Sequence, residues 1–240
     1  MNGRVAVVTG GGRGIGRAIA LRFAAEGAEV VISSRTKDDL DAVAAQGEGR
    51  IHPVVADALD PDGARLPVRE AVDRHGHVDV LVNNVGGYQR TFEETLTLNL
   101  LSAWWTTEEA LPHMRRHGWG RIINIGSGAS RRASASPGYT AAKHGLVGLT
   151  RQLAVDTGTQ GITVNCLCPG WTNTSLLDWD RVAATKGVTT EEARGAAEAD
   201  SAQRRILEPE ELTGLAVLLA SEGGAGITGQ VLAVDGGYKL

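Results

Sequence analysis

Two side chains capable of proton transfer, Tyr139 and Lys143, lie four positions apart at the start of a segment with helical patterning. Residues four apart on a helix share one face, so the two side chains are expected to be neighbours. A tyrosine hydroxyl with an ordinary pKa of about 10 exchanges protons poorly at neutral pH, and an adjacent ammonium group favours its ionised form. The pair can therefore protonate a carbonyl oxygen or deprotonate an alcohol.

Ser127 follows directly after an apolar run at 121–125 that reads as a strand. Its hydroxyl can donate a hydrogen bond to the same substrate oxygen and fix its position, while the Lys143 ammonium can also hold a ribose hydroxyl. These three residues form a candidate site for carbonyl or alcohol chemistry.

A glycine-rich turn, TGGGRGIG at 9–16, follows the first apolar run and precedes a segment with helical patterning. Gly10, Gly14 and Gly16 allow the backbone to turn tightly and approach a pyrophosphate, and the free amides at a helix N-terminus favour negative charge. The order strand, glycine turn, helix predicts a dinucleotide-binding site.

The end of the second predicted strand indicates which dinucleotide is bound. An acidic residue there would favour NAD(H), but this chain has Ser34 and Arg35, and the first carboxylates, Asp38 and Asp39, fall in the first turn of the next predicted helix. Arg35 can pair with a 2′-phosphate, and Arg13 can approach it from the glycine turn. NADP(H) is therefore favoured over NAD(H).

Short apolar runs alternate with helix-patterned segments along the whole chain. Several runs are almost continuously aliphatic, as in parallel strands buried on both faces. We predict an α/β fold, a single Rossmann-type domain over 1–240 with a doubly wound parallel sheet of about seven strands and helices on both faces. The expected strands are 5–9, 29–33, 52–55, 78–83, 121–125, 162–168 and 230–234, and the expected helices are 16–26, 37–45, 63–74, 102–116, 140–157 and 209–219.

One long polar stretch, 171–207, does not fit the alternation, and we interpret it as a substrate lid. Trp171 and Trp179 within it, together with Tyr88, make an aromatic-lined cleft plausible.

The composition excludes several other classes of protein. The 240 residues carry a net charge of −4 without a basic cluster, so no nucleic-acid partner is expected. No apolar stretch has the length of a membrane span or of a signal segment, which favours a cytoplasmic protein with no membrane partner. Cys166 and Cys168 read as buried free thiols, and the six scattered histidines without a CxxC pair predict no metal site.

The motifs together resemble those of the classical short-chain dehydrogenase/reductase family, and of its ketoreductases in particular. The glycine turn, NNVG at 83–86, Asn99, Ser127, the YxxxK of 139–143 and Pro169-Gly170 occur in the family's order and span almost the full chain. The resemblance implies that Tyr139 is the general acid, Ser127 orients the carbonyl, Lys143 lowers the Tyr139 pKa and binds the nicotinamide ribose, and Asn99 marks a helix kink that holds a proton-relay water.

The resemblance also implies the remaining cofactor contacts. Asn83 would stabilise the central sheet near the cofactor, Asp57 would meet the adenine, and Pro169-Gly170 with Thr172 would hold the nicotinamide. The expected catalytic residues are Asn99, Ser127, Tyr139 and Lys143. The expected cofactor-binding residues are Gly10, Arg13, Gly14, Ile15, Gly16, Ser34, Arg35, Asp57, Asn83, Gly86, Tyr139, Lys143, Pro169, Gly170 and Thr172.

Two departures from the family pattern affect these expectations. Val85 replaces the usual alanine, and the interval between Asn83 and Asn99 is shorter than in the family, so the loop after the fourth strand and the start of the next helix are expected to be cut back. That helix usually contributes to a subunit interface. A homo-oligomer, tetramer or dimer, is expected from the resemblance alone.

The leading hypothesis is an NADPH-dependent reductase that transfers hydride to a ketone of ketoacyl, polyketide-like or cyclic type and yields a secondary alcohol. An NAD-linked alcohol or hydroxy-acid dehydrogenase is the alternative enzyme. A nucleotide-binding protein without turnover is a third reading, against which the intact Tyr139, Lys143, Ser127 and Asn99 argue.

Overall fold

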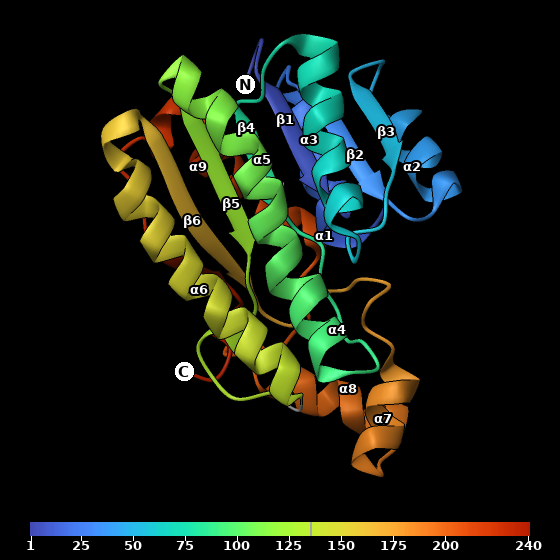
Figure 1. The fold of residues 1–240 in the computed structure, drawn as a ribbon. Coiled ribbons are helices and arrows are strands. Elements are labelled where there is room, and N and C mark those ends of the chain that lie inside the picture. The colour runs from blue at the N-terminus through green and yellow to red at the C-terminus, as the bar shows by residue number, and fades with distance from the viewer. Residues whose placement is uncertain (135) are drawn as a thin grey trace.

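Seven parallel strands form one continuous sheet in the order β3-β2-β1-β4-β5-β6-β7 (Figure 1). The computed structural model describes residues 1–134 and 136–240. The strands are β1 Val5–Thr9, β2 Glu29–Ser34, β3 Ile51–Val55, β4 Val80–Asn83, β5 Gly120–Ile125, β6 Ile162–Pro169 and β7 Val231–Val234. The doubly wound parallel sheet predicted from the sequence is confirmed.

The helices lie on both sides of this sheet. They are α1 Gly14–Ala25, α2 Lys37–Ala44, α3 Pro61–His75, α4 Phe92–Leu96, α5 Ser102–His117, α6 Pro137–Thr157, α7 Trp179–Lys186, α8 Thr190–Ala199 and α9 Thr213–Ala220. A π-helical turn, Thr97–Leu101, joins α4 to α5, and short 3-10 turns occupy Gly128–Ser130, Gly158–Gln160, Pro209–Leu212 and Glu222–Gly224.

Alternate residues of the buried strands point to opposite faces, and each face has its own apolar core. One core packs α1, α2 and α9 against the sheet through Ile19, Leu40 and Leu219. The other packs α3, α5 and α6 through Val68, Met114 and Leu153, and these three helices lie in front of the sheet in Figure 1. Every residue of β1, β5 and β6 is buried, so these strands are rich in aliphatic side chains, and polar residues among them such as Asn124 and Asn165 are hydrogen-bonded inside the protein.

The predicted strands and long helices agree with the structure to within three residues at each end, except that the predicted helix 209–219 begins with a 3-10 turn. The shortened interval after β4 lies in the loop at 84–91, because helical structure runs from Phe92 through the π-helical turn to His117. The sequence patterns did not predict α4, the π-helical turn, α7 or α8.

The segment 171–207 contains α7 and α8. Its two ends pair with each other through a parallel bridge between Thr172 and Leu207, and Ser201 pairs with Tyr238, outside the segment, in an antiparallel bridge. Its role as a substrate lid stays a prediction. Among the described residues, no helix combines the length and the apolar character needed to cross a bilayer.

Candidate active site

The glycine turn between β1 and α1 lies at the carboxyl ends of the strands. Gly10 and Gly14 have φ values of 66° and 54°, which favour glycine, and a Cβ at Gly16 would lie 2.3 Å from the Gly10 carbonyl oxygen. No side chain caps α1 and its first turn has no acidic residue, so the amides around Gly14 and Ile15 face the turn without a competing carboxylate. The turn can hold a pyrophosphate at a helix N-terminus.

Asn84 holds this turn in place and is a residue that the sequence patterns did not single out. Its side-chain amide donates to the carbonyl oxygens of Thr9 and Gly10 at 3.0 and 3.1 Å, and its backbone amide donates to the Thr9 hydroxyl at 3.0 Å. The sequence signal that could have identified Asn84 is its place as the second asparagine of the NNVG motif at 83–86.

Asn83 itself faces the opposite way, into a buried polar network. Its side-chain amide donates to Thr107 and to Asn124, and Asn124 donates in turn to Thr150 at 2.9 Å. The network ties β4 and β5 to α5 and α6, which is the sheet-stabilising role that the resemblance implied.

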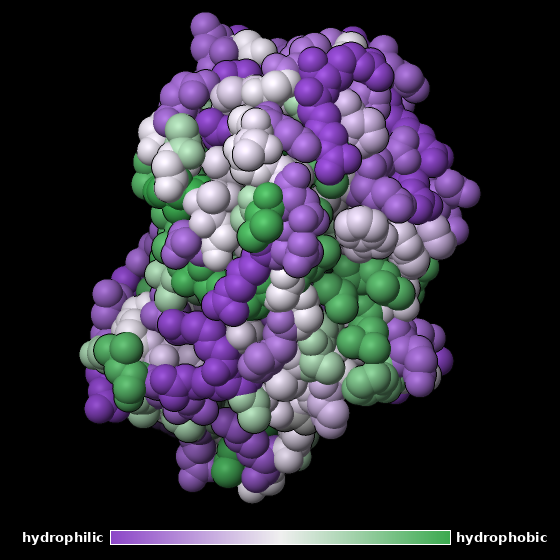
Figure 2. Space-filling model, turned by 60° about the vertical axis from the view of Figure 1, so that its left-hand side comes forward, coloured by the Kyte–Doolittle hydropathy of each residue, from purple (hydrophilic) through white to green (hydrophobic). Residues whose placement is uncertain are grey.

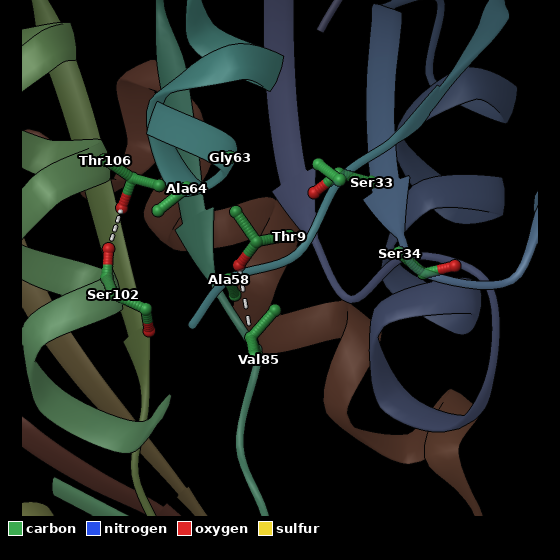
Figure 3. A pocket seen from close by; sticks show the side chains of 10 residues that line it. Thr9, Ser33, Ser34, Ala58, Gly63, Ala64, Val85, Ser102 and Thr106 are labelled. Carbon is green, nitrogen blue, oxygen red and sulfur yellow. Dashed lines mark hydrogen bonds between the residues drawn. The ribbon is translucent and has the colours of Figure 1, made fainter. Parts of the chain in front are cut away.

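A small pocket next to the turn lies where an adenosine would be expected (Figure 3). Its lining residues are Thr9, Ser33, Ser34, Ala56, Ala58, Gly63, Ala64, Val85, Ser102 and Thr106. Asp57 lies at its margin, with its backbone oxygen against Gly63 and its carboxylate accepting from the Leu59 amide at 3.0 Å.

The residues expected to select the cofactor lie at the end of β2. A Cβ at Gly12 would lie 3.2 Å from the Ser34 hydroxyl and 3.1 Å from the Cβ of Asp39, so Asp39 sits against the glycine turn. Arg13 and Arg35 are exposed, and neither guanidinium forms an ion pair or a hydrogen bond with any residue in 1–134 or 136–240. Two cationic groups are thus available to a phosphate at this position.

The proton-transfer residues come from β5 and α6. Ser136 caps α6 by accepting from the Tyr139 backbone amide, which places Tyr139 and Lys143 on the first turns of the helix. The Lys143 ammonium lies 5.6 Å from the Tyr139 ring centroid and donates to the Ile125 carbonyl oxygen at 2.8 Å. Ser127 lies two residues beyond Ile125, so the structure brings the three predicted residues together.

Burial is the main cause of the pKa shifts of Lys143 and Tyr139. Lys143 is 3% exposed, and desolvation of its ammonium lowers its pKa to about 8. Desolvation also raises the pKa of Tyr139, while the Ser127 hydroxyl acts in the opposite direction. At neutral pH the protein therefore holds a charged lysine beside a protonated tyrosine.

Asn99 lies in the π-helical turn and is buried. Its amide nitrogen donates to the Gly87 and Thr95 carbonyl oxygens at 2.7 and 2.8 Å, and its oxygen accepts from the Gly87 amide. A Cβ at Gly86 would lie 2.8 Å from the Asn99 oxygen and 3.2 Å from the Lys143 nitrogen. Asn99, Gly86 and Lys143 are thus in direct proximity, beside the predicted kink.

The segment after β6 covers the glycine turn. Thr172 is buried and donates to the Gly170 carbonyl oxygen at 3.1 Å, directly after Pro169. Farther on, a Cβ at Gly14 would lie 3.1 Å from Thr174, and a Cβ at Gly87 would lie 3.3 Å from Leu176. This segment therefore encloses the space between the glycine turn and the catalytic residues.

Aromatic side chains line the entrance beside Tyr139. The rings of Tyr88 and Tyr139 lie 4.8 Å apart between centroids, and the Arg181 guanidinium lies 5.5 Å from the Tyr88 ring. Trp171 packs against Trp179 at 5.9 Å and against Tyr238 at 6.5 Å. These aromatic side chains thus pack in two groups, one of them with a cation from α7, and the aromatic-lined cleft stays a prediction.

The two cysteines lie behind Ser127. Both are buried and free, with their sulfur atoms 3.7 Å apart, and a Cβ at Gly126 would overlap both. The prediction of two buried free thiols is confirmed.

The site as a whole fits a nicotinamide dinucleotide. Gly16 packs so closely on the turn that a Cβ there would overlap the Gly10 carbonyl oxygen, a small pocket at Ser33 and Val85 lies beside the turn, and Tyr139 lies at the far end next to Lys143. A nicotinamide bound at that end would lie near a proton donor.

Comparisons with known proteins agree with this geometry. A family model described as Enoyl-(Acyl carrier protein) reductase matches residues 10–239. A D-beta-hydroxybutyrate dehydrogenase from Cupriavidus necator is 35% identical over 99% of this chain and 98% of its own. The chain belongs to the short-chain dehydrogenase/reductase family, and it is an oxidoreductase that acts on CH–OH or C=O groups with a nicotinamide cofactor.

Two solved structures are similar over nearly their whole length. An actinorhodin polyketide ketoreductase with NADPH superimposes with a TM-score of 0.92 at 32% identity, covering 98% of this chain and 97% of that one. A protein from Beutenbergia cavernae, provisionally described as an NAD(P) dependent gluconate 5-dehydrogenase with bound NADP, has a TM-score of 0.87 at 40% identity and covers 99% and 97%.

Proposed function

We propose that the protein is an NADPH-dependent carbonyl reductase that converts a ketone into a secondary alcohol. The observation that carries the proposal is the arrangement of a buried lysine with a half-buried tyrosine and serine at one end of a dinucleotide site whose other end presents Arg13 and Arg35 without protein partners among the described residues. The dinucleotide, when bound, supplies the hydride.

The protein's own residues supply the proton and the orientation. Ser127 donates a hydrogen bond to the substrate carbonyl oxygen, and Tyr139 protonates that oxygen as the alcohol forms. The Lys143 ammonium, anchored on Ile125, stabilises the tyrosinate left behind and holds the nicotinamide ribose. Asn99 keeps the loop at Gly87 in place beside Lys143 and marks the kink at which a relay water would bind.

NADP(H) is the preferred cofactor in this proposal because Ser34, Arg35 and Arg13 can surround a 2′-phosphate. One specific observation favours the alternative, an NAD-linked alcohol or hydroxy-acid dehydrogenase. Asp39 packs against Gly12 beside Ser34, where its carboxylate could accept from a ribose 2′-hydroxyl and would repel a 2′-phosphate. The cofactor preference therefore depends on whether the attraction of Arg13 and Arg35 for a 2′-phosphate outweighs the repulsion of that phosphate by Asp39.

The proposed substrate is a ketone of ketoacyl, polyketide-like or cyclic type. The relatives include a polyketide ketoreductase and a hydroxy-acid dehydrogenase, so the ketone side and the alcohol side of such chemistry both occur among them. The stacked Tyr88 and Tyr139 rings suit a flat or apolar substrate body, and Arg181 suits an anionic group at the entrance.

The test is turnover with NADPH and, in parallel, with NADH on a β-ketoester, a β-ketoacyl thioester and a cyclic ketone, with Tyr139→Phe as the control. We expect NADPH-dependent turnover that falls about a hundredfold or more in Tyr139→Phe, since a general acid is removed. A clear preference for NADH would favour the dehydrogenase. Tight dinucleotide binding without turnover on any carbonyl or the matching alcohols would favour the non-catalytic reading.

A homo-oligomer, tetramer or dimer, is part of the proposal. Leu101 and Trp104 on the helical run before and within α5, and Val155 on α6, are exposed at 40%, 36% and 79%. A surface groove runs between α5 and α6, and on the face that Figure 2 turns toward the viewer several apolar patches lie between polar side chains. These exposed apolar groups suit a contact between copies of the chain.

We further propose a cytoplasmic location, where buried thiols such as Cys166 and Cys168 stay reduced.

A further inference from the structure

Three potential metal ligands meet at the end of the sheet remote from the active site. Glu29 begins β2, His52 lies in β3, and His75 is the last residue of α3. Because α3 runs antiparallel to the strands, its C-terminus lies at their amino ends, at the top of Figure 1. The catalytic residues lie at the carboxyl ends, so this cluster is separate from the dinucleotide site.

The ligand atoms of the three residues are already close together. One atom from each lies within 4.8 Å of the other two, and His52 Nε2 is 3.0 Å from the Glu29 carboxylate. Neighbouring ligand atoms in a tetrahedral zinc site are about 3.3 Å apart, given bond lengths of about 2.0 Å. The Glu29 and His52 pair has this spacing, and rotation of the His75 ring would bring its nitrogen to the same distance.

The state of His75 also points to a ligand. Its Nε2 atom is buried and has no hydrogen-bond partner in the described chain, although buried imidazole nitrogens are normally paired. The His52 and His75 rings lie 5.3 Å apart between centroids. Desolvation and the neighbouring His52 lower the pKa of His75, which is the direction that favours the neutral, metal-coordinating ring.

We propose that Glu29, His52 and His75 form a binding site for a transition-metal dication, with Zn²⁺ as the best match. Two imidazole nitrogens and one carboxylate are the ligand types that Zn²⁺, Co²⁺ and Ni²⁺ share, whereas Mg²⁺ and Ca²⁺ prefer oxygen ligands alone. The metal replaces the proton between His52 and Glu29, and water completes the coordination. It links α3 to β2 and β3, which already pair as parallel strands and share the Arg50–Glu29 ion pair at this edge.

One neighbouring charge limits the affinity. Arg50 donates to the other oxygen of Glu29 at 2.9 Å, so a cation already shares that carboxylate. The C-terminal carbonyl groups of α3 act in the other direction and favour a positive charge beside His75. We expect one ion per chain with a dissociation constant below about 100 μM, weaker than a closed four-ligand zinc site.

The experiment uses the full chain without a polyhistidine tag, after removal of metals with a chelator. Calorimetric titration with ZnCl₂ should give one site per chain. CoCl₂ should give visible absorption bands of a four- or five-coordinate ion, and saturating zinc should raise the Tm by several degrees. MgCl₂ should produce none of these changes.

His75→Phe is the decisive variant, because it keeps a ring in the same space and removes a buried nitrogen that has no partner among the described residues, so the protein should remain folded. His113→Phe is the matched control, since His113 is another half-buried histidine outside the cluster. We expect at least a tenfold loss of zinc affinity in His75→Phe and no change in His113→Phe. Absence of saturable binding by the parent chain would overturn the proposal, as would equal zinc affinity in His75→Phe.

Discussion

The buried Lys143 should make the stability of this protein rise with pH in a range where lysines usually have no effect. Burial lowers the pKa of Lys143 from 10.5 to about 8 in the folded protein, whereas the unfolded chain regains the ordinary value. Between these two values the unfolded chain binds more protons, so the free energy of unfolding increases as pH rises through that window. Below about pH 8 the full destabilisation is present.

The size of the effect follows from the shift. The difference between the Lys143 pKa values of the unfolded and the folded chain destabilises the folded protein by roughly 3 kcal/mol at neutral pH, at about 1.4 kcal/mol for each pKa unit. About 1 kcal/mol of it should be relieved between pH 7 and pH 9, and about 2.5 kcal/mol by pH 10. Lys143→Met removes the ionisable group while keeping a similar length, so the variant lacks this pH-dependent contribution.

The assay is urea unfolding of the parent chain and of Lys143→Met at pH 7, 8, 9 and 10, followed by tryptophan fluorescence. Titrating groups that do not interact with Lys143 cancel in the difference between the two proteins, whereas Cys166 and Cys168, which affect the Lys143 pKa, also contribute to it. The variant also leaves the Ile125 carbonyl oxygen without its donor, which costs about 1–3 kcal/mol at every pH. The informative quantity is therefore the change of the difference with pH.

We expect the stability of the variant relative to the parent to fall by about 2.5 kcal/mol between pH 7 and pH 10. Lys186→Met, at an exposed position on α7, serves as the control and should give a flat difference. A difference for Lys143→Met that stays constant within about 0.5 kcal/mol would refute the reasoning, because it would mean that the folded protein does not perturb this ammonium group.

Three further predictions concern the active site. Arg35→Ala should weaken NADPH binding about tenfold or more and NADH binding far less, as measured by cofactor fluorescence, because a charge-assisted contact to the 2′-phosphate is lost; equal losses for both would contradict the assigned role. Gly86→Ala should lower kcat at least tenfold in steady-state kinetics, because its Cβ would crowd Asn99 and Lys143, whereas Gly148→Ala, where nothing lies within 4 Å, should leave kcat unchanged. Arg181→Ala should raise KM for an anionic β-keto substrate and leave KM for a neutral cyclic ketone unchanged; a rise for both would indicate a general effect on the α7 region.

The fold was largely predictable because its local signals agree with one another. β1 is almost entirely aliphatic, and β5 and β6 are rich in buried aliphatic residues, so all three are recognisable as strands buried within a sheet. The glycine turn and the Ser136 cap mark the starts of α1 and α6 through backbone requirements that few residues satisfy. α7 and α8 were missed because the only residues they bury are alanines, Ala183 in α7 and Ala193 and Ala197 in α8, so no large aliphatic side chain marks their buried faces.

The sequence predicted those site residues whose role follows from their residue type and their local spacing. The Tyr139 and Lys143 pair is readable because four positions on a helix define a shared face. Asn84 was missed because its task, holding the Thr9 and Gly10 carbonyl groups, depends on a contact across 75 positions of sequence. The position of Asp39 against Gly12 depends equally on how α2 packs beside the turn, and spacing alone assigned that residue to solvent.

The metal-ligand cluster shows the same limit at the other end of the sheet. His52 and His75 are separated by an entire helix, and they meet only because α3 begins at Pro61 with Asp60 as its cap and ends at Gly76 in a left-handed conformation. Those two ends place His75 beside the first residues of β2 and β3. The scattered histidines predicted no metal site from their spacing along the chain, and the zinc titration decides between that prediction and the proposed site. Shifting the end of α3 by one residue would rotate His75 by about 100° and take it off the face that carries Glu29 and His52. The zinc titration therefore also tests whether the end of α3 presents His75 on that face.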